Sequence, residues 1–174
     1  MESYSAFDPG DHLLPVVSAK SFAALRGWEF GWALLEPINI AADQGASEYA
    51  LSRRLTPGQK ALYFFWYLDV QVVDGGFVGF FLNGYGVYLP PLYAGLELIG
   101  DQKMLRLLQA AERAYRAHAA DFDATLESND VEGLYEQMEH MEELDIQYFS
   151  GRDNTMSLIE RYARAHVAEF AKLQ

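Results

Sequence analysis

The placement of glycine and proline constrains the fold of this chain most strongly, because these residues mark where helices begin and end. Thr56-Pro57 is the clearest helix start, with threonine as the N-cap and proline in the first helical position. The apolar helix that follows is expected to run to Asp74 and to stop at Gly75-Gly76. Similar signals predict further helices over residues 15–35, 77–83, 90–99, 102–118, 130–149 and 154–173.

No stretch combines the β-branched residues and turn signals that a sheet requires, so the predicted class is all-α. The chain has 174 residues, a length that suits one domain with a sizeable core. It has neither internal repeats nor a linker long enough to divide it. We therefore expect a single all-α domain over residues 1–174.

Several classes of protein are disfavoured by what the sequence lacks. Cysteine is absent, which leaves no disulfide framework and no thiolate metal site. The first residues do not resemble a secretory signal, and the longest apolar stretch, residues 61–73, is interrupted by Asp69 and is too short to span a bilayer. The Gly-x-Ser-x-Gly and phosphate-loop motifs are missing, as are the Glu-x-x-His pairs of a di-iron bundle. We expect a cytoplasmic protein without catalytic residues, cofactor, metal, membrane contact or direct nucleic-acid contact.

The negative charge is concentrated in one segment. The net charge of the chain is −12, yet residues 117–151 contain no lysine or arginine and carry −10 of that total. The acidic residues of this segment are Asp121, Asp123, Glu127, Asp130, Glu132, Glu136, Glu139, Glu142, Glu143 and Asp145. Such a field repels nucleic acids and anionic membranes and attracts basic proteins or cations.

Within the predicted helix 130–149, four carboxylates fall on one side: Glu132, Glu136, Glu139 and Glu143. Like charges at this spacing disfavour a helix, so either solubility or partner binding must explain them. Internal neutralisation is a third interpretation, because the preceding helix carries Lys103, Arg106, Arg113 and Arg116. Four cations cannot neutralise ten carboxylates, and some acidic surface is expected to remain.

Other polar side chains of the chain have mainly structural interpretations. Glu142 and Asp145 lie near the apolar side of the predicted helix, and each is expected to pair with an arginine or a tyrosine hydroxyl. His166 lies among apolar neighbours and is expected to be a core histidine, whereas His140 is expected on the polar side.

A second candidate site lies in the middle of the chain. Asp69, Asp74, Phe77 and Asn83 could form a pocket with the neighbouring aromatic residues. Aromatic residues at helical spacing are more often core, and a dimer surface is a further interpretation.

The same region resembles a known family. The ordered motifs are Asp74-Gly-Gly-Phe77, Phe80-Phe-Leu-Asn83, Tyr88-Leu-Pro90 and Leu96-Glu-Leu-Ile-Gly100. They resemble the bacterial acidic DNA-mimic protein family, most of whose members have no known function. The family usually has Asn before the Gly-Gly pair and Gln two residues after the Phe, where this sequence has Asp74 and Gly79.

The resemblance implies an all-α fold, a homodimer and no catalytic machinery. The mimic in that family places carboxylates where DNA has phosphates, and so occupies basic DNA-binding proteins. Phosphate recognition rests largely on lysine and arginine charge, which a carboxylate array can imitate. The motifs, however, lie in the middle of the chain and outside the acidic segment.

Three hypotheses follow. In the first, the chain is a non-enzymatic acidic protein that binds a basic, DNA-binding partner through Asp121, Asp123, Glu127, Asp130, Glu132, Glu136, Glu139 and Glu143. In the second, it is an immunity protein that blocks a basic toxin such as a nuclease. In the third, it is a small-ligand protein or an enzyme that uses the central pocket.

Overall fold

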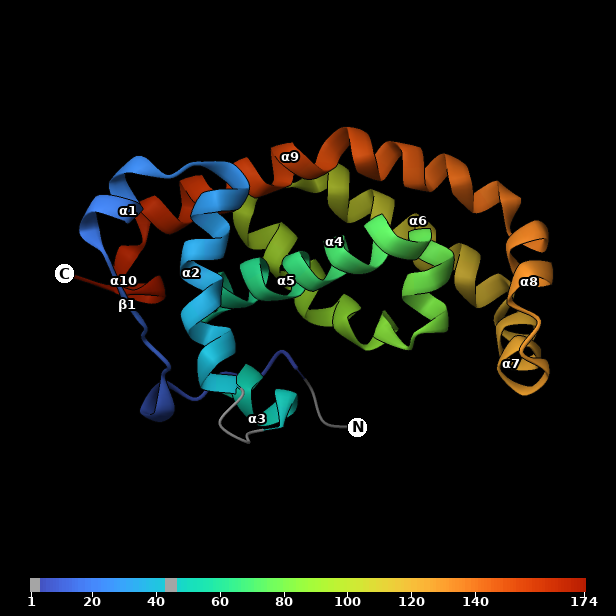
Figure 1. Cartoon of the computed structure of the whole chain (residues 1–174), viewed down its shortest axis with the longest axis horizontal. Helices are drawn as coiled ribbons and strands as arrows, with labels where there is room; N and C mark the ends of the chain where they lie inside the picture. The colour runs from blue at the N-terminus through green and yellow to red at the C-terminus, as the bar shows by residue number, and fades with distance from the viewer. Residues whose placement is uncertain (1–3, 43–46) are drawn as a thin grey trace.

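Helices account for most of the chain in the computed structural model, which describes residues 4–42 and 47–174 (Figure 1). Within these residues the α-helices are α1 Ala19–Ala24, α2 Gly27–Ala42, α3 Glu48–Arg53, α4 Pro57–Leu82, α5 Leu89–Ile99, α6 Gln102–Ala117, α7 Ala119–Ser128, α8 Val131–Gln137, α9 Glu142–Ala165 and α10 Val167–Phe170. Three short 3-10 helices are η1 Pro9–Asp11, η2 Tyr85–Tyr88 and η3 Glu139–Met141. Two-residue strands β1 Val16–Val17 and β2 Lys172–Leu173 pair in parallel. The all-α class is confirmed, and the helices pack into one compact domain around a continuous apolar core.

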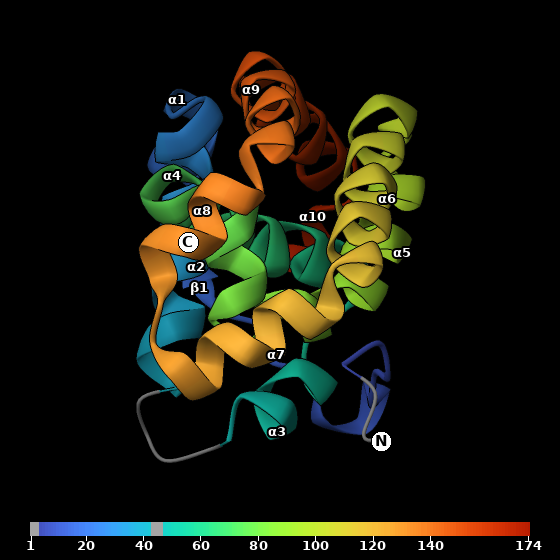
Figure 2. The same cartoon turned by 90° about the vertical axis from the view of Figure 1, so that its right-hand side faces the viewer.

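Helix α4 is the centre of this core. Its start is as predicted: Gln59 N–H donates to the Thr56 hydroxyl, and the Gln59 side chain accepts from the Thr56 N–H, which forms a capping box. Helices α2, α5 and α9 pack around it (Figures 1 and 2). By length and composition α4 could also cross a membrane, but half of its most apolar window is buried among these neighbours. Burial inside the fold therefore accounts for its apolar character.

The predicted stop at Gly75-Gly76 is a bend in α4. Gly75 has φ −138° and Gly76 has φ 58°, so neither is helical, and the helix resumes at Phe77. The combination of φ 58° and ψ −169° at Gly76 is open almost only to glycine. The predicted helices 77–83, 90–99 and 102–118 correspond to the second part of α4, to α5 and to α6.

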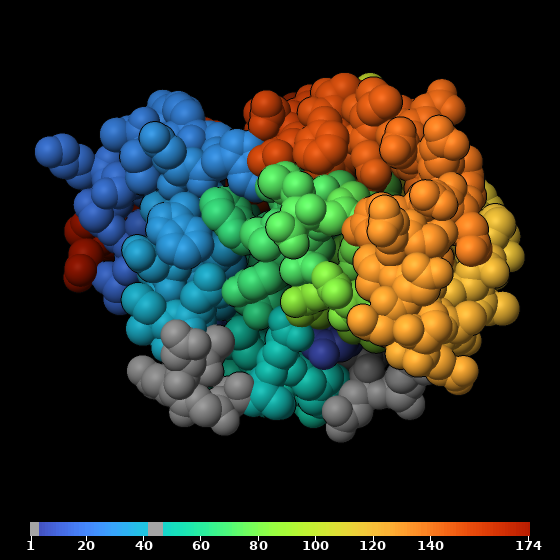
Figure 3. All heavy atoms as spheres, turned by 45° about the vertical axis from the view of Figure 1, so that its right-hand side comes forward, coloured from blue at the N-terminus to red at the C-terminus, as the bar shows by residue number. Residues whose placement is uncertain are grey.

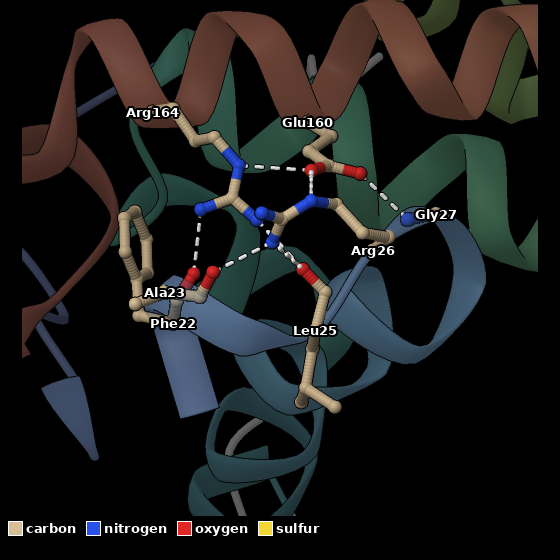
Figure 4. Close-up of polar contacts among 7 residues, drawn as sticks. All are labelled: Phe22, Ala23, Leu25, Arg26, Gly27, Glu160 and Arg164. Atoms are coloured by element: carbon tan, nitrogen blue, oxygen red, sulfur yellow. Dashed lines mark hydrogen bonds and ion pairs between the residues drawn. The ribbon is translucent and has the colours of Figure 1, made fainter. Parts of the chain in front are cut away.

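The single helix predicted over residues 15–35 is wrong. This stretch forms β1, α1 and the first part of α2, and Pro37 lies inside α2. The break has a tertiary cause, shown in Figure 4: Arg164 donates to the carbonyls of Phe22 and Leu25, and Glu160 accepts from the Gly27 N–H at 2.6 Å. Side chains of α9 thus bind the backbone groups that a continuous helix would pair internally.

The helix predicted over residues 130–149 is also wrong. The stretch contains α8, η3 and the first part of α9, and α9 then continues through Ser150-Gly151 to Ala165. Met138 and Met141 are buried where the chain leaves α8, so core packing fixes this break. His166 is exposed at the end of α9 and stacks on Tyr162, which contradicts its predicted core position.

The aromatic residues of the middle of the chain are largely core. Phe77, Phe80, Phe81 and Tyr88 are buried, and Tyr85 and Tyr93 pack against them. Their ring contacts continue to α6 and α7, where Phe81 stacks on Tyr115 with ring centroids 4.3 Å apart. This continuous packing matches the core interpretation of the aromatic pattern.

Candidate partner-binding surface

Helices α7 and α8, η3 and the start of α9 lie together at one end of the long axis of the molecule, opposite α1 and α10 (Figures 1 and 2). We call their exposed side chains the acidic end. Figure 3, which brings this end forward, shows the orange atoms of α8 as a broad surface beside α4. The segment that carries most of the negative charge in the sequence is therefore also a distinct region in space.

A few buried apolar side chains hold this end in place. Phe122, Leu134, Met138 and Met141 are each at most 2% exposed and join the main core. Between α7 and α8 the chain turns at Asn129, which has φ 60° and caps α7. Asp130 then caps α8, accepting from the Gly133 N–H at 3.1 Å. The acidic residues are thus displayed on fixed backbone, not on a loose loop.

The carboxylates of the acidic end face solvent. Eight of the ten are exposed and two, Asp121 and Asp145, are half-buried. The exposed ones are Asp123, Glu127, Asp130, Glu132, Glu136, Glu139, Glu142 and Glu143. All eight predicted partner-binding residues therefore lie at the surface: seven are exposed and Asp121 is half-buried.

Within the residues that the structure describes, none of these carboxylates forms an ion pair with lysine or arginine. Asp121 contacts His118 at 3.0 Å, and Arg116 pairs instead with Glu112 on its own helix. The hypothesis of internal neutralisation by α6 therefore fails. The charge is uncompensated and its field extends into solvent.

The predicted four-glutamate stripe does not lie on one helix. Glu132 and Glu136 belong to α8, Glu139 to η3 and Glu143 to α9. A shallow groove of about 390 Å³ is lined by Tyr135, Glu136, Glu139 and Glu142. Glu142, which we expected to need a buried partner, is exposed and belongs to this groove. The sequence could not show this, because the groove exists only where the chain breaks between α8 and α9.

Tyr135 and Asp145 attach the acidic end to the bend in α4. The Tyr135 hydroxyl donates to the Gly75 carbonyl at 2.8 Å. Asp145 accepts from the Phe77 N–H at 2.8 Å, so its partner is a backbone amide and not the predicted arginine or tyrosine hydroxyl. Burial raises the pKa of Asp145, and this hydrogen bond opposes the rise.

The central motif and the acidic end are therefore physically joined, although they are about 60 residues apart in sequence. Gly79 contributes to this joint, since a Cβ there would lie 3.2 Å from the Tyr135 hydroxyl. A larger side chain at this position would compete with Tyr135 for space. The absence of a side chain at Gly79 is thus compatible with the position of Tyr135.

The four predicted pocket residues have separate surroundings. Asp69 is buried, accepts from the Tyr148 hydroxyl and pairs with Arg152 at 2.9 Å. Its pKa is raised by burial, and Tyr148 and Arg152 oppose the rise. Asp74 is exposed, Phe77 is core, and Asn83 donates to Gln71. None of the four lines the groove at the acidic end or the groove between α6 and α9.

The histidines and carboxylates of the described residues were also compared with the arrangement of metal ligands. Within residues 4–42 and 47–174, no three His, Asp or Glu side chains converge as metal ligands do. His118 and His140 approach each other with ring centroids 5.2 Å apart, but they gather no third ligand of suitable position.

The fold and this surface define an all-α protein with an acidic end that its own cations leave uncompensated. Comparison with protein families agrees with that description: the family model described as DMP19-like protein matches residues 53–166, and the chain belongs to this family. The match spans the central motif and the whole acidic end. A relative named DNA mimic protein DMP19, from Neisseria meningitidis serogroup B (strain ATCC BAA-335 / MC58), is 28% identical over 122 residues. That alignment covers 68% of this chain and 74% of the relative.

Proposed function

We propose that this protein is a non-enzymatic DNA mimic that occupies the DNA-binding surface of a basic protein with its acidic end. The observation that carries the proposal is the set of eight exposed carboxylates without a lysine or arginine partner. Membership of the DMP19-like family and the name of the meningococcal relative support it.

The spacing of the carboxylates suits this role. Glu132 and Glu136 lie one helical turn apart on α8, about 6 Å along the axis. Successive phosphates of one DNA strand advance about 3.4 Å along the duplex axis, so this pair spans about two phosphate steps. Lysine and arginine side chains arranged for phosphates would therefore meet carboxylates at comparable intervals.

The groove at the acidic end gives such a partner an anchor point. Three carboxylates surround it, and Tyr135 adds an aromatic ring. A guanidinium group can donate two parallel charge-assisted hydrogen bonds to a carboxylate, and it can also stack on the ring. An arginine of the partner fits this groove better than a lysine does.

The test compares two triple variants of equal charge. One replaces Glu136, Glu139 and Glu142 by Gln, and the matched control replaces Glu29, Glu36 and Glu97, which are exposed outside the acidic end. Both are used to capture basic proteins from the native host, and duplex DNA is then added as competitor. Captured proteins are identified by mass spectrometry and their affinities measured at several salt concentrations.

We expect the wild type and the control to retain DNA-binding proteins that duplex DNA displaces, and the groove variant to bind them at least tenfold more weakly. The dependence of affinity on salt should also be shallower for the groove variant, because fewer charges are paired. Equal loss of binding in both variants would point to net charge alone. Capture that DNA does not displace would contradict mimicry.

A further inference from the structure

A second groove lies between α6 and α9, away from the acidic end. Its volume is about 580 Å³, within the range of small-molecule sites in proteins. The two helices run antiparallel here, with Met104 of α6 near Gly151 of α9. The apolar floor of the groove consists of Met104 and Leu107, which are buried, and of Ala110 and Leu144, which are half-buried.

The rim of this groove carries positive charge. Lys103 and Arg106 line it from α6, three residues apart and thus about 4.5 Å apart along the helix axis. Both are exposed, and neither forms an ion pair with any residue that the structure describes. These are two of only 13 lysine and arginine residues in a chain of net charge −12.

One carboxylate, Asp101, also lines the groove, but it is already engaged. It is 4% exposed, accepts from the Met104 N–H at 3.0 Å and accepts from the Thr155 hydroxyl at 2.6 Å. On the opposite wall Gln147 and Asn154 offer neutral amides. The accessible charge of the groove is therefore positive, although the protein as a whole repels anions.

We infer that this groove binds a small amphipathic carboxylate, with the carboxylate between Lys103 and Arg106 and the apolar body on the floor. Arginine can bind a carboxylate through two parallel hydrogen bonds, and lysine adds a point charge. An apolar chain of moderate length would cover Ala110 and Leu144, which line the groove and are only half-buried. This inference does not depend on the proposed partner binding, which uses a different surface.

The test uses three probes, decanoate, decanol and acetate, which separate the charged group from the apolar chain. Binding is measured by calorimetry, and chemical-shift changes of the backbone amides locate the site. We expect decanoate to bind at least tenfold more tightly than decanol, with the shifts confined to α6 and α9. Acetate should show no binding in the same concentration range, because it has no apolar body.

Two variants test the site itself. Replacing Lys103 and Arg106 by Gln should weaken decanoate binding at least tenfold and leave decanol binding unchanged. Filling the groove with Ala110→Trp should weaken both. The control replaces Lys20 and Arg113 by Gln, which removes the same charge at exposed positions outside the groove. Circular dichroism establishes that each variant is folded.

Three outcomes would overturn the inference: equal affinities for decanoate and decanol, an equal loss in the control variant, or decanoate binding that Ala110→Trp does not change. Absence of any binding of decanoate by the wild-type protein at millimolar concentration would overturn it as well.

Discussion

The carboxylate of Asp145 in α9 accepts a hydrogen bond from the backbone N–H of Phe77 at 2.8 Å, at the point where α4 bends. Phe77 begins the second part of α4, directly after the two non-helical glycines, so its N–H belongs to the first turn after the bend. Asp145 therefore acts as an N-cap supplied by another helix. The same contact places the start of α9, and with it the groove at the acidic end.

Replacement of Gly76 by Ala should be severely destabilising. The backbone at Gly76 lies in a region that only glycine adopts easily, and a Cβ there would be 2.5 Å from Asp145 Oδ2. We expect a loss of about 3 kcal/mol in the free energy of unfolding, measured by urea denaturation. The control is Gly100→Ala, where φ is 79° but no atom lies within 4 Å. There the loss should be only about 1 kcal/mol; equal losses would show that the contact with Asp145 is unimportant.

Asp145 itself should respond differently to Asn and to Ala. Asn retains an oxygen for the Phe77 N–H, whereas Ala removes this acceptor, at a cost of about 1–3 kcal/mol. Because burial raises the pKa of Asp145, the folded state binds more protons than the unfolded state as pH rises above 3.8. The wild-type protein should therefore lose stability with rising pH in that range. Asp145→Asn should lose less, and pH-dependent urea denaturation would reveal the difference.

Glu160 of α9 contacts the backbone at the break between α1 and α2. Its carboxylate pairs with Arg164 at 2.8 Å and accepts from Gly27, and its side chain is only 13% exposed (Figure 4). Glu160→Ala would leave the Arg164 guanidinium, whose side chain is 28% exposed, without its carboxylate partner and the Gly27 N–H without its acceptor. We expect a loss of about 3 kcal/mol in thermal or urea denaturation.

The exposed pair between Asp11 and Arg54 provides the comparison for Glu160, since the Asp11 side chain is 65% exposed. Asp11→Ala should cost less than about 1 kcal/mol. A comparable loss from both substitutions would mean that Glu160 acts as an ordinary surface charge.

Lys60 should make the stability of the protein depend on alkaline pH. Its ammonium group is buried and donates to the Ala6 carbonyl, and burial lowers its pKa from 10.5 to about 8. Between these values the unfolded chain holds the proton that the folded chain has lost, so stability rises with pH, by at most about 1.4 kcal/mol per pH unit. Urea denaturation between pH 8 and pH 10 measures this slope. Lys60→Met should abolish it, and Lys172→Met, at an exposed position, should preserve it.

The elements predicted correctly share one property, which is that their boundary signals are local. The capping box at Thr56 and Gln59 and the left-handed glycine at Gly100 act within a few residues, so their effect is visible in the sequence. The local signals at Pro37 and at Ser150-Gly151 were equally clear, but neither position ends a helix in the structure. In those places packing of α2 and α9 against the core outweighs a modest local cost of glycine or proline in a helix.

In the acidic end, the sequence predicts the charge but not the arrangement of the charged residues. Charge is a property of composition, so the sequence located the segment and identified seven of its eight exposed carboxylates. Their arrangement depends on the break between α8 and α9, which the burial of Met138 and Met141 fixes. A helical projection therefore placed Glu142 on the wrong side and missed the groove that it shares with Tyr135.

By itself the sequence determined the helical class, the start of the central apolar helix at Thr56-Pro57 with its interruption at Gly75-Gly76, and the concentration of negative charge in one segment, because each follows from residue type and short-range spacing. Only the tertiary structure decided that α6 does not neutralise this charge, that Tyr135 and Asp145 join it to the bend in α4, and that Lys103 and Arg106 border a separate groove. These relationships depend on contacts between residues far apart in the chain, and no local pattern encodes them.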